Sequence, residues 1–234
     1  MPDARQLDFG AYEKKGLYLH LKDGTRLELT DENIQQTTDK FWSDPARLNP
    51  ETKSAVAIQR CPACPLRKED DFCDALRPIL PFLEVVDKFV SFDEVLAIYK
   101  GKRKDLLRIS QTTMQNALKY LSILSLTHYC QSFAKFRKYF YGITPLMTLK
   151  ESVTCIYLNL YWLYRGDLKA MNELLTEFKE KLTLISQNQV KRLSVISQND
   201  AFINAFVKTQ LLTEFISVDM EKALTDAYQN VEGT

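Results

Sequence analysis

The apolar residues of this chain change their period near residue 111, and this change limits the fold more than any other feature. Before that point, apolar and polar residues alternate in short runs separated by turn residues, a pattern typical of β-strands. After it, apolar residues recur every three or four positions, a pattern typical of helices. We therefore expect an α+β fold in which an N-terminal part, residues 1–110, with antiparallel β-hairpins and a Cys-rich loop, docks on a C-terminal α-helical bundle, residues 111–234.

The first hairpin is predicted in GLYLHLKDGTRLELT, residues 16–30, where leucines alternate on both sides of an Asp-Gly pair. A two-residue turn at this pair would place leucines opposite charged residues and mix the two faces of the hairpin. A three-residue turn over residues 22–24 instead pairs Leu19 with Leu27, so that the leucines share one face. We therefore predict the three-residue turn.

The rest of the N-terminal part is predicted to mix strands with one helix. A second hairpin is expected in EVLAIYKGKRKDLLRIS, residues 94–110, with its turn near Gly101. A further strand is expected in residues 54–60, directly before the cysteines. Residues 74–90 carry leucines at helical spacing, and the two prolines of this segment must lie in the first turn or kink the helix.

The C-terminal part is predicted to be a series of helices. The first begins after Ser110, a good N-cap residue. The second covers residues 149–165 and is apolar around most of its circumference, so we expect neighbours on several sides. A long amphipathic helix follows Asp167 and continues to about Ser197, with one or two helices after it. These apolar surfaces suit either an internal bundle or a homodimer formed through the C-terminal helices.

The charge balance bears on the class of partner. The chain has 31 Lys or Arg and 30 Asp or Glu, so a net charge of +1 provides no overall field toward nucleic acid or anionic lipid. The first ten residues carry charges where a signal peptide needs an apolar core, and no run approaches the length that spans a bilayer. We therefore expect a cytoplasmic protein with no membrane partner, whose partner is an unidentified protein.

Three of the five cysteines fall inside RCPACPLRKEDDFC, residues 60–73. Cys61 and Cys64 form a C-x2-C pair, a spacing at which one tight turn can direct two thiolates to a tetrahedral ion. Cys73 follows on a loop long enough to bring a third sulfur back. A thioredoxin-like site would place the pair at the start of a helix in a βαβ unit, whereas this segment resembles a loop. A metal site is therefore our first interpretation, with a redox dithiol or simple packing as alternatives.

A closed structural site needs a fourth ligand from elsewhere in the chain. Cys130 and His128 are candidates because they lie where a predicted helix ends, and a ligand at a helix end is easily aimed. His20 and Cys155 are also possible, although Cys155 lies within a helix and is better explained as a small buried apolar residue. Four thiolates can bind zinc or an iron–sulfur cluster, and the dispersed cysteines favour zinc.

The CPACPL segment, the third cysteine after eight further residues, the RISQTTMQNAL segment and the cysteine after a Leu- and Ser-rich helix resemble an uncharacterised family of bacterial cytoplasmic proteins. The resemblance covers about residues 55–165 and implies Cys61, Cys64, Cys73 and Cys130 as the metal ligands. Gln131 stands where that family has proline. The family's Arg-Phe-His-Leu-Pro-Phe segment is replaced by RKYFYGITPL, which has no histidine. The resemblance implies no assigned activity.

Catalytic signatures are scarce in the sequence. It contains no glycine-rich phosphate loop, no G-x-S-x-G and no H-E-x-x-H, and it has two histidines in total. Our leading hypothesis is therefore a non-enzymatic interaction or regulatory protein stabilised by a Cys-ligated structural metal. The second hypothesis is a redox or sensor protein that uses the same cysteines, either as ligands of an iron–sulfur cluster or as reactive thiols.

Two basic stretches suggest a third hypothesis, nucleic-acid binding. KGKRK is a compact positive tip, and FAKFRKYFY mixes cations with rings, a combination that neutralises phosphates and stacks bases. However, lysines at a hairpin tip also keep a strand edge soluble, and aromatic residues at this spacing usually belong to a core. Nucleic acid is therefore not our expected partner. The residues that would bind it are Lys102, Arg103, Lys104, Lys135, Arg137 and Lys138.

Overall fold

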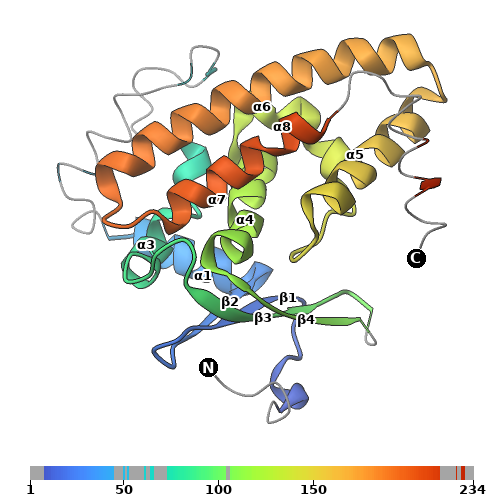
Figure 1. Cartoon of the computed structure of the whole chain (residues 1–234). Helices are drawn as coiled ribbons and strands as arrows, with labels where there is room; N and C mark the ends of the chain where they lie inside the picture. The colour runs from blue at the N-terminus through green and yellow to red at the C-terminus, as the bar shows by residue number, and fades with distance from the viewer. Residues whose placement is uncertain are drawn as a thin grey trace.

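The computed structural model describes residues 8–44, 50, 52, 61, 64, 65, 73–103, 106–216, 225, 228 and 229. Its N-terminal part contains a four-stranded antiparallel sheet, and helices stack above this sheet (Figure 1). The strands, in the spatial order β2-β1-β3-β4, are β1 Gly16–His20, β2 Arg26–Thr30, β3 Glu94–Lys100 and β4 Leu107–Thr113. The predicted α+β class is therefore confirmed.

Both predicted hairpins are present. In the first, Leu19 pairs with Leu27, as expected for a three-residue turn. The amide of Leu21 donates to the carbonyl of Thr25 (2.9 Å), and Gly24 has the left-handed φ of 87° that such a turn requires. In the second hairpin, β3 pairs with β4. The predicted strand at residues 54–60 lies outside the described residues.

The predicted helices are present in the predicted order, and α1 is an additional helix that the sequence analysis did not predict. They are α1 Asp31–Trp42, α3 Leu80–Val86, α4 Met114–Leu124, α5 Leu149–Tyr164, α6 Leu168–Ile196, α7 Ala201–Gln210 and α8 Leu212–Phe215. Shorter 3-10 segments are η2 Phe9–Ala11, η4 Asp74–Leu76 and η6 Gln131–Phe140, and η5 Ser125–Tyr129 is a π-helix. Among the described residues, no helix combines the length and the apolar character needed to cross a bilayer.

The first helix of the C-terminal part begins later than predicted. Ser110 does not cap it, because this residue lies within β4. The strand continues to Thr113, which pairs with Glu94 of β3. Thr113 then takes the N-cap position of α4 with extended backbone angles. Sheet pairing with β3 therefore overrides the local capping preference of the serine.

The junction between α5 and α6 agrees with the prediction. Arg165 (φ 53°) and Gly166 (φ 80°) adopt left-handed conformations that end α5. Asp167 caps α6 by accepting a hydrogen bond from the Ala170 amide at 3.1 Å.

As expected, α5 has neighbours on several sides, since it contacts η6, α6 and α8, but one of its faces stays exposed. Several large side chains near the C-terminal end of α5 are exposed, and Trp162 retains 78% of its accessible surface. The reason is positional, since the described neighbours of α5 leave that end of the helix uncovered. The exposed residues are Leu158, Tyr161, Trp162 and Leu163.

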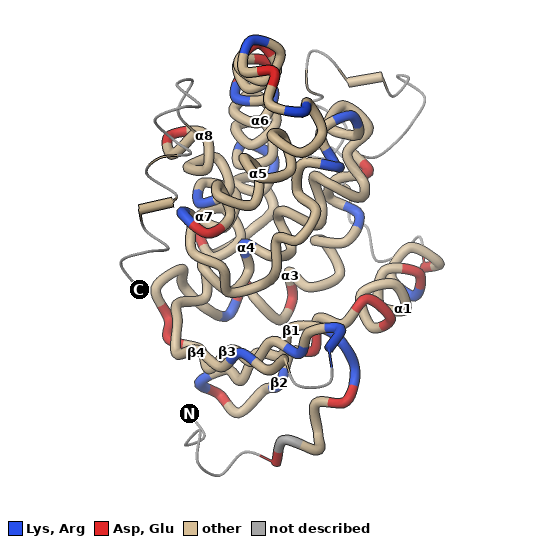
Figure 2. The backbone as a smooth tube through the Cα atoms, turned by 90° about the vertical axis from the view of Figure 1, so that its right-hand side faces the viewer, with Lys and Arg blue, Asp and Glu red and all other residues tan. Residues whose placement is uncertain are grey.

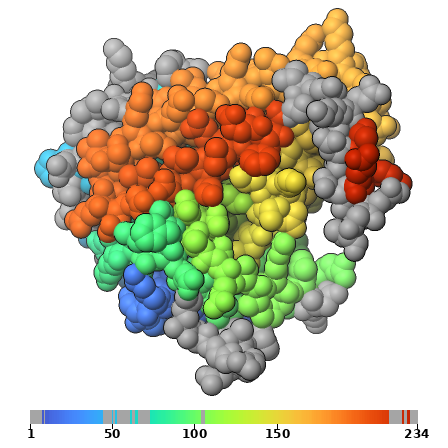
Figure 3. Space-filling view, in the orientation of Figure 1, coloured from blue at the N-terminus to red at the C-terminus, as the bar shows by residue number. Residues whose placement is uncertain are grey.

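One hydrophobic core runs through both parts of the chain. Leu17, Leu19 and Leu29 on the helix-facing side of the sheet belong to the same cluster of buried residues as the apolar faces of α3, α4, α6 and α7. In the space-filling view of Figure 3, α7 lies directly against the neighbouring α3–β3 segment. The amide of Ser91 also donates to Asp200 Oδ1 (2.7 Å), which joins the segment before β3 to the N-cap of α7. The helix-facing side of the sheet therefore shares its core with the helices, while Tyr12, Tyr18 and Ile98 form a small separate apolar cluster on the other side.

Candidate metal centre and basic pocket

Cys73 and Cys130 are brought together by two short segments that lie side by side. Cys73 is the N-cap residue of η4, and Cys130 separates the π-helix η5 from η6. The hydroxyl of Ser125 donates to the carbonyl of Ala75, and Gln131 Nε2 donates to Asp74 Oδ2 at 3.4 Å. The Cys-rich segment and the end of the α4–η5 helix are therefore held in contact.

Cys61 and Cys64 form a tight turn beside this contact. The amide of Cys64 donates to the carbonyl of Cys61 at 2.8 Å. Cys61 and Cys130 are buried, whereas Cys64 and Cys73 are half-buried and pack against the same hydrophobic core. Cys73 and Cys130 thus lie on neighbouring segments, and the assignment of these two cysteines with Cys61 and Cys64 as metal ligands stays a prediction.

The buried thiols are held in their protonated form. Burial raises the pKa of the Cys61 thiol to about 11; Cys73 and Cys64 raise it further, while the charge of Arg192 lowers it. Burial likewise raises the pKa of Cys130 to about 12, with smaller contributions from Cys73 and Cys61. A protonated thiol is a poor nucleophile, so the environment does not favour a reactive dithiol.

Helix α6 covers the cysteine cluster with two polar side chains. The fully buried Gln189 donates from Nε2 to Cys73 Sγ at 3.3 Å. Arg192, also buried, acts electrostatically on Cys61. Our sequence reasoning missed both residues. A signal was present, because they continue the buried spacing of Leu182 and Ile185 at positions where an apolar residue is expected.

The donor set fits a thiolate-binding metal in its chemistry, although the sulfurs are not arranged as a coordination sphere. Within the described part of the chain, no group of three or more Cys, His, Asp or Glu side chains is close enough to hold an ion. The other candidate ligands lie elsewhere. His20 Nε2 is hydrogen-bonded to Tyr12 Oη (2.7 Å) on the sheet, Cys155 is half-buried on α5, and His128 lines a separate pocket.

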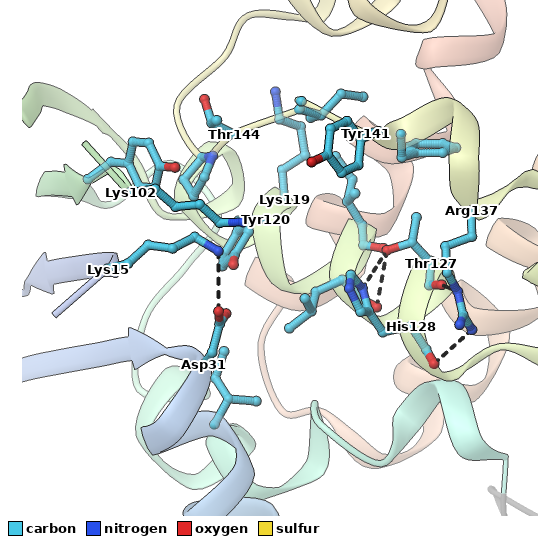
Figure 4. A pocket seen from close by; sticks show the side chains of 18 of the residues that line it. Lys15, Asp31, Lys102, Lys119, Tyr120, Thr127, His128, Arg137, Tyr141 and Thr144 are labelled. Carbon is cyan, nitrogen blue, oxygen red and sulfur yellow. Dashed lines mark hydrogen bonds and ion pairs between the residues drawn. The ribbon is translucent and has the colours of Figure 1, made fainter. Parts of the chain in front are cut away.

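That pocket is the second candidate site. It has a volume of about 1040 Å³ and lies between the β3–β4 turn, α4 and the chain from η5 to the loop before α5 (Figure 4). Of its described lining residues, Asp31 is the one carboxylate and seven are cations. The cations are Lys15, Lys102, Arg103, Lys119, Lys135, Arg137 and Lys138. We call this site the basic pocket.

The two basic stretches of the sequence meet in the basic pocket. Lys102 and Arg103 come from the β3–β4 turn, and Lys104 lies outside the described residues. The cations of the second stretch, Lys135, Arg137 and Lys138, come from η6. Most aromatic residues between the η6 cations face away from solvent: Phe133, Phe136, Tyr139 and Phe140 are buried. Tyr141 is exposed and lines the pocket. The rings of η6 therefore serve the core, as their spacing indicated.

Lys119 is the most buried cation of the pocket, with 7% of its surface exposed. Its Nζ donates to the carbonyl of Met147 at 2.6 Å, which ties α4 to the loop before α5. Burial lowers its pKa to about 8, Glu151 opposes this shift, and Lys208 adds to it. The sequence carried no signal for this role, since Lys119 is placed at the pocket by the tertiary packing of α4.

Arg137 organises the other end of the pocket. It donates to the carbonyl of Thr127 and, at 3.0 Å, to that of His128. The His128 ring accepts or donates a hydrogen bond with the Thr127 hydroxyl at 2.9 Å. Desolvation and the charge of Arg137 lower the pKa of His128, which keeps this ring neutral at physiological pH.

Comparison with known proteins places the chain in one family. A family profile described as "Domain of unknown function (DUF6901)" matches residues 18–231. No curated protein and no solved structure matches the chain. The matched range contains the sheet except for the first two residues of β1, the four cysteines proposed as ligands and nearly all of the basic pocket. The chain therefore belongs to the family defined by the domain of unknown function DUF6901.

Proposed function

We propose that this protein is a non-enzymatic interaction or regulatory protein, and that Cys61, Cys64, Cys73 and Cys130 bind a structural metal ion, with zinc favoured over an iron–sulfur cluster. The observation that carries the proposal is that Cys73 and Cys130 lie on segments held in contact with each other, that Cys61 and Cys64 share one tight turn, and that Gln189 of α6 donates to Cys73. The CPACPL segment supports a place among bacterial cytoplasmic proteins.

The electrostatic environment supports a structural role over thiol redox chemistry. The raised pKa values of Cys61 and Cys130 keep these thiols protonated near neutral pH, and redox dithiols depend on an accessible thiolate. A zinc ion would replace these protons, and its binding free energy would add to the stability of the fold. The bound ion would join the Cys-rich segment to the η5–η6 junction. Closing the coordination sphere requires the four sulfurs to draw together around the ion.

The first test is elemental analysis together with a visible absorption spectrum, on protein purified anaerobically without added metal or chelator. We expect one zinc ion per chain and no visible band. Iron with acid-labile sulfide and a visible band that bleaches on reduction would replace zinc by the iron–sulfur alternative. Absence of both metals would overturn the metal proposal.

A cysteine series identifies the ligands. Cys61→Ser and Cys130→Ser should each release the metal and lower the melting temperature, because loss of one ligand from a closed site weakens the whole site. Cys155→Ser is the matched control, since Cys155 is a half-buried thiol on α5 outside the cluster. Equal metal content and equal melting temperature in all three variants would contradict the assignment.

The exposed apolar end of α5 supports a homodimer formed through the C-terminal helices as the protein's partner. Trp162, Tyr161 and Leu158 place large apolar surface in solvent on one helix, and such surfaces often mark protein contacts. Sedimentation equilibrium should detect a dimer, and Trp162→Lys should shift it toward monomer. A protein that stays monomeric at all concentrations tested would rule this partner out.

A further inference from the structure

We propose that the basic pocket binds a small organic polyanion that carries a planar ring, a nucleotide being the chemical class that fits best. This inference concerns a site separate from the cysteine cluster and does not depend on a bound metal. It rests on three features of the pocket, namely its excess of positive charge, the placement of these charges, and the apolar wall between them.

The positive charge in the pocket exceeds what its described carboxylate can balance. Asp31 is within 3.2 Å of Lys15, so that pair is already formed. Lys119 and Arg137 are held by backbone carbonyls, which carry no formal charge. Lys135 reaches the carboxylate of Glu177, outside the pocket lining. The chain as a whole has a net charge of only +1, and Figure 2 shows charges of both signs spread along it, so this excess is local.

The cations are distributed over both ends of the pocket. Figure 4 shows Lys15 and Lys102 at the sheet side and Arg137 at the opposite side, with Lys119, Tyr120 and Tyr141 between them. An anion in a partly enclosed site interacts more strongly with such charges than it would at an open surface, because less water screens it. This arrangement suits a ligand with several negative charges.

The wall between the cations is apolar and aromatic. Burial, with Asp31 and Tyr99 adding to the effect, raises the pKa of Tyr120, so its hydroxyl stays neutral beside the cations. A bare phosphate ion would fill little of a volume of about 1040 Å³ and would leave this wall hydrated, whereas a ring would cover it. The apolar residues that line the pocket also include Ile34, Ile123, Leu124, Ile143 and Leu146.

A small ligand fits these features better than a nucleic-acid strand. Strand binding generally uses a positively charged groove with exposed rings on which successive bases stack. Here the rings of Phe133, Phe136 and Tyr139 lie in the core, and the cations of the two basic stretches line one concave pocket. Binding of a strand is therefore the alternative that the experiment must separate.

The experiment is isothermal titration calorimetry on the full chain with three probes: ATP, inorganic triphosphate and a short single-stranded oligonucleotide. We expect ATP to bind about tenfold or more tightly than triphosphate, because its base covers the apolar wall. Binding should weaken as salt is added. Equal affinity for ATP and triphosphate would contradict the claim that the pocket recognises a planar ring. Binding of the oligonucleotide without binding of ATP would contradict the claim that the ligand is a small molecule.

Paired variants connect the binding to the pocket. Lys102→Gln with Lys138→Gln removes two exposed cations of the pocket, and we expect about a tenfold or greater loss of ATP affinity. Lys169→Gln with Lys191→Gln is the control, since it removes the same charge from exposed positions on α6 outside the pocket. Equal affinity in the two double variants, or no heat with any probe, would overturn the proposal. Metal content measured on the same samples separates this result from a failure of the cysteine site.

Discussion

Lys119 shows how a single buried charge can lower the stability of the fold and at the same time line a binding pocket. Its ammonium group is almost entirely removed from water and has a backbone carbonyl as its hydrogen-bond acceptor. Burial of an ammonium group with only a carbonyl as its hydrogen-bond acceptor favours the neutral amine, which is the physical cause of the lowered pKa. Proteins retain such residues most often at functional sites. An anion bound beside Lys119 would favour its charged form.

The pH dependence of stability tests this description. The folded chain releases the Lys119 proton near pH 8, whereas the unfolded chain keeps it to about pH 10.5. Between these values the unfolded state binds more protons, so the free energy of unfolding rises with pH. From below pH 8 to pH 10, we expect wild type to gain about 2 kcal/mol relative to Lys119→Met. Urea unfolding at both pH values measures this gain, which should be absent when wild type is compared with the exposed Lys169→Met. Parallel pH curves for wild type and Lys119→Met would contradict the prediction.

At the scale of elements, helix ends are set by local signals where no neighbouring strand competes. Thr148 and Glu151 form a reciprocal capping box at the start of α5, and Glu151 also pairs with Arg108 of β4 at 3.0 Å. The π-helix η5 is different. Its last turn is closed by a hydrogen bond from the Cys130 amide to the carbonyl of Ser125, five residues earlier. This wider turn leads directly into the position of Cys130 beside the other thiols.

The N-cap of α6 offers an element-scale prediction. Asp167→Ala removes the side-chain acceptor of the Ala170 amide, and we expect the free energy of unfolding to fall by about 1 kcal/mol. Glu180→Ala, at an exposed position within the same helix, should change stability far less, because alanine favours a helix interior. Chemical denaturation of both variants checks the difference. Equal losses would show that the cap contributes nothing specific to α6.

At the scale of the whole molecule, sheet and helices share one core and are also linked by polar contacts. Asp200 accepts from the amide of Ser91, and Asp87 accepts from the amide of Gln198 at 3.2 Å. Both contacts tie the turn between α6 and α7 to the chain beside β3. A continuous core with such links should unfold as one cooperative unit.

Two probes can test this cooperativity. The sequence has two tryptophans, Trp42 in α1 and Trp162 in α5. In Trp162→Phe, fluorescence reports on Trp42 alone, in the N-terminal part, where its Nε1 donates to the carbonyl of Arg77, while far-ultraviolet circular dichroism reports mainly on the helices. We expect the two thermal transitions to coincide, because neither part can lose its packing without exposing the shared core. Two separated transitions would show that the parts fold independently.

The sequence by itself determined the features that depend on neighbouring residues. The alternation of leucines defined the register of the first hairpin, and Gly166 with Asp167 marked the boundary between α5 and α6. These features follow from local backbone preferences and from the face that an apolar residue must bury. The same reasoning selected four cysteines as metal ligands, and this assignment stays a prediction.

The tertiary structure alone decided the features that depend on distant segments. It extended β4 past Ser110, placed Gln189 and Arg192 over the cysteines, and brought Lys119 to the same pocket as the two basic stretches. None of these has a short-range pattern, because burial and charge at a site are sums over groups that only packing brings close. For that reason, two basic stretches that suggested an exposed nucleic-acid surface became two walls of one pocket.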